Sequence, residues 1–248
     1  MRLFVSADRV CGDSLTLEPS DAQHVSRVLR MQPGDEVTVC CGNGRAYRCV
    51  LDAVGKKDVS ARILSEEPFN NEPDVFITVY AGLSKGDRFD YLIQKCVECG
   101  ASHIVPFVSR YCVARPEEKD LEKKRQRFAR IALEASKQCQ RSRAVTVGEI
   151  VPFERAAAMA AEADCDLILY EKENRQSLSA ALRAAKGGGT YSVITGPEGG
   201  FADDEVRLAT EAGASCVSIG PRILRCETAP VAAVCAIMYQ TGNFDIGE

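Results

Sequence analysis

Between residues 75 and 239 the sequence alternates between short apolar runs rich in β-branched residues and longer amphipathic runs. The first kind predicts buried strands and the second predicts helices. The predicted strands are residues 75–81, 103–108, 145–150, 166–170, 191–195 and 216–219, and the predicted helices are residues 88–99, 121–139, 153–162, 178–185, 203–212 and 229–239. Such alternation is typical of a parallel sheet covered by helices on both faces, so we expect an α/β domain here. Gly100 and residues 187–189 are predicted to end the first and the fourth of these helices.

Residues 1–66 instead consist of short strand-like runs separated by turn residues. The predicted strands are residues 3–5, 14–17, 36–40, 46–52 and 59–64, with turns at 12–13, 33–35 and 42–44. One helix is predicted over residues 20–30, capped by Ser20 or Asp21, with Val25, Val28 and Leu29 on its apolar face. Short strands with one helix predict a small β-barrel. The polar segment 66–73 holds two prolines and has no periodicity, so we place the domain boundary there, between domains 1–70 and 71–248.

The net charge and the length of the apolar runs limit the classes of partner that the chain can have. A formal net charge of −4 argues against general affinity for nucleic acid but leaves room for a local basic patch. The first residues do not form a signal peptide, and the longest apolar run, 229–239, is well short of the roughly 20 residues of a membrane span. We therefore expect a cytoplasmic protein without a membrane partner.

The 12 cysteines are scattered along the chain, mostly inside apolar segments. Cys96 and Cys99 have the spacing of half a zinc site or a redox pair, but no second pair matches them and the only histidines are His24 and His103. Reduced, buried cysteines are therefore the favoured interpretation, and no metal is predicted. His24 is interpreted as a structural residue of its helix.

Two glycine-containing stretches follow predicted strands late in the chain. Residues 193–201 read Val-Ile-Thr-Gly-Pro-Glu-Gly-Gly-Phe, and residues 218–229 read Ser-Ile-Gly-Pro-Arg-Ile-Leu-Arg-Cys-Glu-Thr-Ala. Glycine turns at strand ends are where open α/β sheets bind ligands, so the two stretches predict one shared pocket. A dinucleotide fingerprint, a phosphate-binding loop and a nucleophilic triad are all missing from the sequence. Glu198 would oppose a pyrophosphate and suits a ligand with positive charge or with amide and hydroxyl donors.

These stretches resemble the small-subunit ribosomal RNA methyltransferase E family. The resemblance rests on two motifs, Gly196-Pro-Glu-Gly-Gly-Phe201 with Glu205 and Gly220-Pro-Arg-Ile-Leu-Arg225-x-Glu227-Thr228-Ala229. It extends to three earlier motifs, which are His24-x-x-x-Val28-Leu29-Arg30, Lys85-x-Asp87-Arg88 and Glu134-Ala135-x-x-Gln138-x-x-Arg141. It implies a SPOUT-type, trefoil-knotted parallel sheet with helices on both faces, preceded by a PUA-like RNA-binding β-barrel. It also implies a homodimer that uses S-adenosylmethionine to methylate N3 of a uridine in small-subunit (16S) ribosomal RNA, within a 30S particle.

The resemblance and the predicted pocket together assign roles to residues. The expected cofactor-binding residues are Leu169, Thr195, Gly196, Pro197, Glu198, Gly199, Gly200, Ile219, Gly220, Ile223, Leu224, Thr228 and Ala229. Arg225 is expected to stabilise the developing uracil anion or to grip RNA, and Glu227 to accept the proton, directly or through water.

Several of these roles have alternatives. Glu227 and Thr228 could instead cap the last helix, and Ile223 and Leu224 could be core residues. Glu198 could instead orient Arg225 or a ligand hydroxyl. A valine at Gly199 is expected to block cofactor entry.

The expected RNA contacts are Arg27, Arg30, Lys85, Arg88, Arg141 and Arg143. Arg141 and Arg143 follow the predicted helix 121–139, which is rich in basic residues and could also be a solvated face. The chain departs from the family at Ser109-Arg110-Tyr111-Cys112, where Ser-x-Arg-Ser is frequent, and at Ala202, where a missing serine passes helix capping to Asp203. Alternative functions are another SPOUT target, such as a ribose 2′-hydroxyl or a tRNA base, a non-catalytic RNA-binding assembly factor and, more remotely, a nicotinamide-dependent enzyme.

Overall fold

The computed structural model describes residues 2–41, 45–56, 58–67, 71–185 and 189–245. Its contacts divide the chain into a first unit, residues 1–72 with 136–144, and a second unit, residues 73–135 with 145–248. The first unit thus includes a late segment that begins in the last turn of helix α3 (Glu118–Gln138). The predicted turn at 42–44, residues 187–188 of the predicted helix end and residues 68–70 of the predicted boundary lie outside the described residues.

The first unit contains a six-stranded sheet in the order β1-β4-β5-β6-β3-β2. The strands are β1 (Arg2–Phe4), β2 (Val10–Cys11), β3 (Ser14–Thr16), β4 (Glu36–Cys40), β5 (Ala46–Val54) and β6 (Val59–Glu67). Only β1 and β4 pair in parallel, and the other neighbours are antiparallel. Alternate residues of these strands, among them Leu3, Leu15, Val37 and Leu51, form an apolar core beneath helix α1 (Pro19–Gln23).

The helix predicted over residues 20–30 begins and ends differently in the structure. Helix α1 starts at Pro19 with Glu18 as its N-cap residue, so neither Ser20 nor Asp21 caps it. Proline suits this first position because its missing N–H would have no helical partner there. The Asp21 carboxylate is instead buried and accepts a hydrogen bond from Lys137 Nζ at 2.5 Å, within the first unit.

Residues His24–Val28 form a π-helical turn in place of the predicted α-helix. The Leu29 N–H donates to the His24 carbonyl at 3.0 Å, five residues back. This wider turn changes the face on which the following side chains lie. Val25 is therefore in the core, whereas Val28 and Leu29 are 66% and 41% exposed, which contradicts the predicted apolar face.

The second unit contains a seven-stranded parallel sheet in the order β10-β8-β7-β12-β11-β13, with β9 also paired to β8. Its strands are β7 (Phe76–Gly82), β8 (His103–Val108), β9 (Thr146–Val147), β10 (Val151–Pro152), β11 (Cys165–Leu169), β12 (Thr190–Thr195) and β13 (Ser215–Val217). The expected parallel α/β sheet is therefore confirmed. The predicted strand 145–150 is confirmed only at β9, because residues 148–150 are not in a strand and separate β9 from β10.

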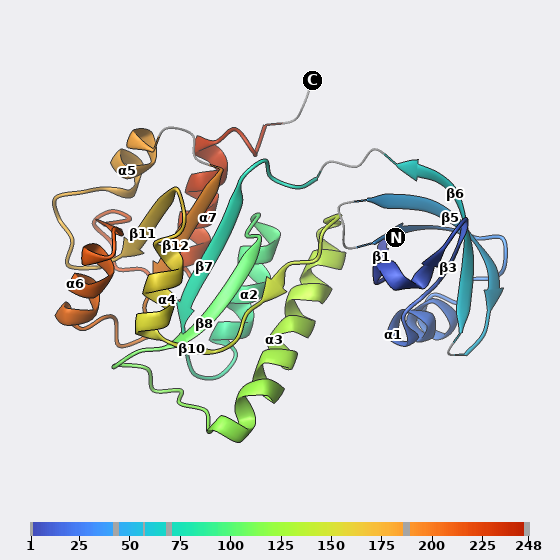
Figure 1. The fold of residues 1–248 in the computed structure, drawn as a ribbon, viewed down its shortest axis with the longest axis horizontal. Helices are drawn as coiled ribbons and strands as arrows, with labels where there is room; N and C mark the ends of the chain where they lie inside the picture. The colour runs from blue at the N-terminus through green and yellow to red at the C-terminus, as the bar shows by residue number, and fades with distance from the viewer. Residues whose placement is uncertain (1, 42–44, 57, 68–70, 186–188, 246–248) are drawn as a thin grey trace. The chain divides into compact units, whose positions relative to one another are not determined.

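Helices cover both faces of this sheet (Figure 1). Helices α4 (Phe153–Ala160) and α6 (Asp203–Glu211) form one layer and pack with Phe107, Ile168 and Ile194 in a single core cluster. Helices α2 (Arg88–Glu98), α7 (Ala229–Gln240) and α5 (Leu178–Ala184) are associated with one another on the opposite face. Gly100 ends α2 with φ of +112°, and a Cβ there would lie 2.7 Å from Met238 Sδ on α7.

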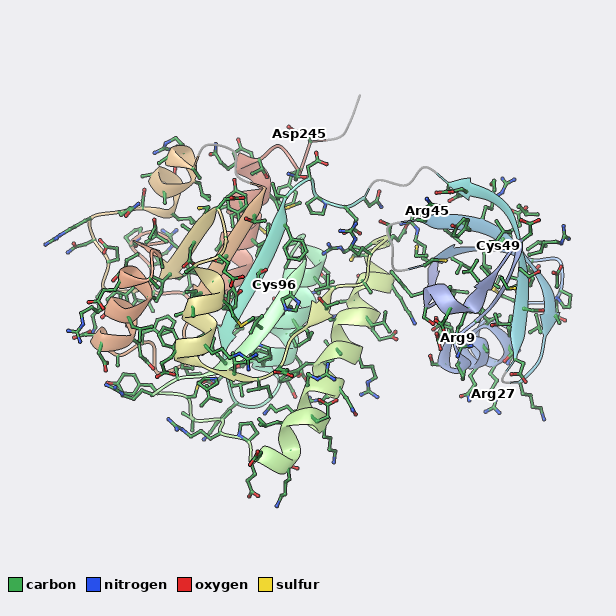
Figure 2. All side chains as sticks on the ribbon, in the orientation of Figure 1. Arg9, Arg27, Arg45, Cys49, Cys96 and Asp245 are labelled. Atoms are coloured by element: carbon green, nitrogen blue, oxygen red, sulfur yellow. The ribbon has the colours of Figure 1, made fainter. Side chains whose placement is uncertain are left out.

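The cysteines are all free thiols. Five are buried, including Cys49 and Cys96, which Figure 2 labels on β5 and α2. Burial raises the pKa of Cys49 to about 12, so this thiol stays protonated at neutral pH. Within the described ranges, no group of three or more His, Cys, Asp and Glu side chains is arranged to hold a metal ion. None of the helices in those ranges combines the length and apolar character needed to cross a bilayer.

Asp166 on β11 is a buried carboxylate, 8% exposed, and is expected to make the stability of the second unit depend on pH. Burial raises its pKa from 3.8 to about 6, although the Ser192 hydroxyl donates to Oδ1. Between these two values the native state binds more protons than the unfolded state, so the free energy of unfolding falls as pH rises. We expect a loss of roughly 2 kcal/mol across this window.

Urea denaturation of the wild type and of Asp166→Asn between pH 4 and pH 7 measures this fall in the free energy of unfolding. Asparagine does not titrate, so the variant should lack this part of the decline. Parallel stability curves for the two proteins would show that Asp166 does not carry it.

Candidate functional site

A cavity of about 920 Å³ lies at the carboxyl ends of β11, β12 and β13. Its walls include the last residues of two strands, Leu169 of β11 and Thr195 of β12, and the loops that follow β12 and β13. Carboxyl ends of parallel strands are where open α/β sheets bind ligands, and a cavity of this volume accommodates a cofactor-sized molecule. The two glycine-containing stretches therefore form one pocket.

Most of the predicted pocket residues line this cavity. They are Leu169, Thr195, Gly196, Pro197, Glu198, Gly199, Gly200, Ile219, Gly220, Ile223, Leu224, Arg225, Glu227 and Ala229. Thr228 is the exception: it is the N-cap residue of α7, although its side chain makes no capping hydrogen bond. Ile223 is 84% exposed, so the core alternative is wrong for this residue.

The loop 196–200 is built by close backbone approaches. A Cβ on Gly196 would lie 3.2 Å from the Gly200 carbonyl carbon, and Gly200 has φ of +68°. A Cβ on Gly199 would lie 2.7 Å from Tyr111 Cβ. The space beside Gly199 is thus filled by Tyr111, so a valine there would first contact Tyr111, and the expected block of cofactor entry stays a prediction. The departure at Tyr111 is connected to the pocket through this contact.

Helix α6 begins after this loop without the predicted aspartate cap. Its N-cap residue is Ala202, and the Glu205 carboxylate accepts the Ala202 N–H at 2.9 Å and the Arg110 N–H at 2.8 Å. Asp203 Oδ1 instead accepts the Tyr170 hydroxyl at 2.7 Å and Lys172 Nζ at 3.1 Å. The prediction that capping passes to Asp203 is therefore wrong, because Glu205, one turn on, supplies the acceptor.

The second loop, which follows β13, carries side chains that can take part in a reaction. The Arg225 carbonyl accepts the N–H groups of Thr228 and Ala229, both at 2.9 Å, which fixes the turn into α7. Among the described residues, no carboxylate lies within ion-pair distance of the Arg225 guanidinium. Glu227 Oε2 accepts a hydrogen bond from Cys226 Sγ at 3.2 Å. Burial, together with this hydrogen bond, raises the pKa of Cys226 to about 12, so Cys226 remains a neutral donor to Glu227.

Glu198 binds the start of α2 and does not pair with Arg225. Its Oε1 accepts the Lys85 N–H and Arg88 Nη1, each at 2.8 Å. Burial alone would raise the pKa of Glu198, but these donors hold it below its ordinary value, so the carboxylate is ionised at neutral pH. The alternative in which Glu198 orients Arg225 is therefore wrong, and the one in which it orients a ligand hydroxyl stays a prediction. Arg88 itself lines the cavity, whereas Lys85 does not.

One wall of the cavity was not predicted from the sequence. The segment 170–177 after β11 contributes Tyr170, Glu171, Glu173, Asn174, Arg175, Gln176 and Ser177. Its position directly after a strand is the same signal that identified the two glycine-containing stretches. The cavity wall carries both charges. Its carboxylates are those of Glu171, Glu173, Glu198 and Glu227, and its guanidinium groups are those of Arg88, Arg175, Arg222 and Arg225.

The predicted RNA contacts fall into two groups. Arg27, labelled in Figure 2, and Arg30 are exposed on the first unit, and Lys85, Arg88 and Arg143 are exposed as well. Arg141 is only 5% exposed, and its Nη2 lies 2.6 Å from Glu72 Oε2. Glu72 also accepts the N–H groups of Ser142 and Arg143 at 2.9 and 3.0 Å. Arg141 therefore holds the segment 136–144 within the first unit and does not present a guanidinium to a phosphate.

Replacing Arg141 by alanine is expected to lower the stability of the first unit by about 2 kcal/mol. Breaking a buried ion pair leaves a carboxylate without its counter-charge, although Glu72 keeps its backbone donors. Hydrogen exchange of amides in residues 2–41 measures this loss. Arg143→Ala is the matched control, because the exposed Arg143 side chain should be dispensable for stability. Equal protection in the two variants would contradict the structural role of Arg141.

The chain is similar to proteins of known family over nearly its whole length. Residues 71–238 match the RNA methyltransferase domain model and residues 17–64 match the RNA methyltransferase PUA domain model. The ribosomal RNA small subunit methyltransferase E of Bacillus subtilis is 32% identical, over 92% of this chain and 91% of that protein. That of Synechocystis sp. is 31% identical, over 95% and 76%. The crystal structure of a ribosomal RNA small subunit methyltransferase E from Neisseria gonorrhoeae bound to S-adenosyl methionine superposes with a TM-score of 0.85, at 30% identity and 96% coverage of each chain.

Proposed function

Because the chain belongs to the ribosomal RNA small subunit methyltransferase E family, we propose that it is an S-adenosylmethionine-dependent methyltransferase of small-subunit (16S) ribosomal RNA. The observation that carries this proposal is the single cavity in which both family loops meet, with Arg225 and Glu227 in its wall. The acceptor is N3 of a uridine, as the sequence resemblance implies.

The cavity suits this cofactor chemically. Leu169, Ile219 and Leu224 offer apolar surface for an adenine ring, and the glycines of loop 196–200 bring backbone donors and acceptors close to the ligand. The carboxylates of Glu171 and Glu173 suit the positive charges of a sulfonium and an ammonium group. When bound, S-adenosylmethionine supplies an electrophilic methyl group.

The side chains of the second loop act on the acceptor. Uracil N3 carries a proton that must leave before its lone pair can form the new N–C bond. Glu227 accepts this proton, directly or through water, and the Arg225 guanidinium stabilises the negative charge that develops over N3 and the two carbonyl oxygens. Alignment of the base within the cavity supplies much of the remaining rate acceleration.

RNA binding uses exposed basic residues of both units. Arg27 and Arg30 of the first unit, with Arg143, contact phosphates, and Arg88 acts at the cavity. The working form is a cytoplasmic homodimer, in which the small-residue face of α7 is a natural partner surface. Its substrate is the rRNA within a 30S particle.

Two measurements test the proposal together. Calorimetry should detect S-adenosylmethionine binding with about one molecule per subunit. Mapping of modified nucleotides in rRNA from cells with and without the protein should show one N3-methyluridine that depends on it. If no cofactor bound, the protein would be a non-catalytic RNA-binding factor. If cells without the protein instead lacked a ribose methylation or a tRNA modification, the acceptor would be a different one.

A further inference from the structure

The Glu198 carboxylate links the glycine loop to a segment far away in the sequence. It accepts two hydrogen bonds of 2.8 Å from the connection between β7 and α2, one from the Lys85 N–H and one from Arg88 Nη1. The same connection touches the loop at a second point, because Gly82 leaves no room for a Cβ beside Pro197. The loop that lines the cavity is thus held against the start of α2.

Glu198 lies beside the N-terminus of α2, because it pairs with the side chain of Arg88, the first residue of that helix. The N-cap residue of this helix, Asp87, makes no side-chain capping hydrogen bond, and its side chain is almost fully exposed. A carboxylate at the positive end of a helix is stabilised by the unpaired N–H groups there. The position of Glu198 is therefore determined by the Lys85 N–H as well as by Arg88.

The Arg88–Glu198 pair lies beside the second loop. Both charges act on the Cys226 thiol, Glu198 raising its pKa and Arg88 lowering it, although burial is the larger cause of its raised pKa. Arg88, Glu198, Cys226 and Glu227 all line the same cavity. The pair is therefore next to the residues that act on the acceptor base.

Arg88 keeps donors for a ligand while Glu198 holds it. A guanidinium has five N–H donors in a fixed fork, and the described contacts of Arg88 use Nη1 alone. Its side chain is 45% exposed, so the rest of the fork faces solvent at the cavity. Planar, fixed donors of this kind match phosphate and carbonyl oxygens of a nucleotide.

We propose that Glu198 is a positioning residue that holds Arg88 at the cavity, where Arg88 binds a phosphate or carbonyl oxygen of the target nucleotide. This inference rests on the proposed function, because it assumes that the cavity receives an RNA nucleotide. It predicts that removing the Glu198 carboxylate weakens RNA binding, whereas removal of a negative charge alone would strengthen it. Deleting a carboxylate near bound RNA should strengthen binding through reduced repulsion, whereas loss of the orienting partner should weaken it.

The test is a double-mutant cycle on RNA affinity with the full-length protein. The ligand is the 30S particle from cells that lack the protein, at one fixed salt concentration. We expect Arg88→Ala to weaken binding about tenfold and Glu198→Ala about fivefold, with the double variant no weaker than Arg88→Ala. Glu198→Gln should recover most of the loss, because its amide oxygen still accepts both hydrogen bonds. In turnover assays the loss should be in KM for the particle more than in kcat.

The matched control is the pair Arg207 and Glu211 on α6, an exposed ion pair of the same unit that is not part of the cavity wall. Its alanine variants should bind the particle like the wild type. Stronger binding by Glu198→Ala, or additive losses in the double variant, would overturn the positioning role. Because the cycle measures binding without turnover, a wild type that binds no S-adenosylmethionine would defeat the proposed function separately.

Discussion

Replacing Arg225 by alanine is expected to lower kcat for methyl transfer by about two to three orders of magnitude. Removing one group that stabilises the charge developing in a transition state has costs of this size. The Arg225 side chain lines the cavity and is exposed, and no carboxylate among the described residues lies within ion-pair distance of its guanidinium. Its charge is therefore available to the uracil anion. The Arg225 carbonyl, which anchors the turn into α7, survives the substitution, so the fold should persist.

Three measurements separate this role from general electrostatics. Single-turnover rates should fall, while cofactor affinity by calorimetry and the free energy of unfolding should stay close to wild type. Arg222→Ala removes a positive charge from the same cavity wall and is expected to leave kcat within about tenfold of wild type. Comparable losses in the two variants would indicate that only the summed positive charge matters, and near-normal turnover by Arg225→Ala would remove this residue from the mechanism.

The predicted residues that line the cavity follow strands. Thr195 and the two glycine-containing stretches were identified because carboxyl ends of parallel strands share one edge of a sheet. The same rule applies to the segment 170–177 after β11, which was missed because it holds no glycine motif. Strand and helix order in the second unit was also predictable, since buried parallel strands and amphipathic helices have distinct apolar periods.

Other features depend on contacts between segments that the sequence keeps apart. From the sequence, Arg141 is expected to be an exposed arginine at a helix end, but in the structure it is paired with Glu72. Tyr111 fills the space beside Gly199, and Glu205 takes the capping role expected of Asp203. The π-helical turn at His24–Val28 includes a hydrogen bond from the Leu29 N–H to the His24 carbonyl, five residues back, which local propensity does not reveal. Each of these corrections changes the role of a residue without changing the fold.

Gly82→Ala is expected to weaken S-adenosylmethionine binding by about a hundredfold and to lower the stability of the second unit by about 3 kcal/mol. A Cβ on Gly82 would lie 2.6 Å from both Pro197 Cδ and Pro197 N, and 3.1 Å from the Gly196 carbonyl carbon. These neighbours are backbone and ring atoms that cannot rotate away, so the loop 196–200 or the end of β7 must move. Overpacking of this kind costs about 1–3 kcal/mol, and here it falls on the loop that lines the cavity.

Gly189→Ala is the matched control, because a Cβ there meets nothing within 4 Å and the backbone is not in the left-handed region. Calorimetry for cofactor affinity and urea denaturation for stability should therefore separate the two variants clearly. Pro197 cannot be relieved by a rotamer change, so a second substitution, Pro197→Ala, should recover part of the cofactor affinity in the Gly82→Ala background by removing Cδ. If Gly82→Ala bound the cofactor like the wild type, the close approach of β7 to the glycine loop would not be what shapes the cavity.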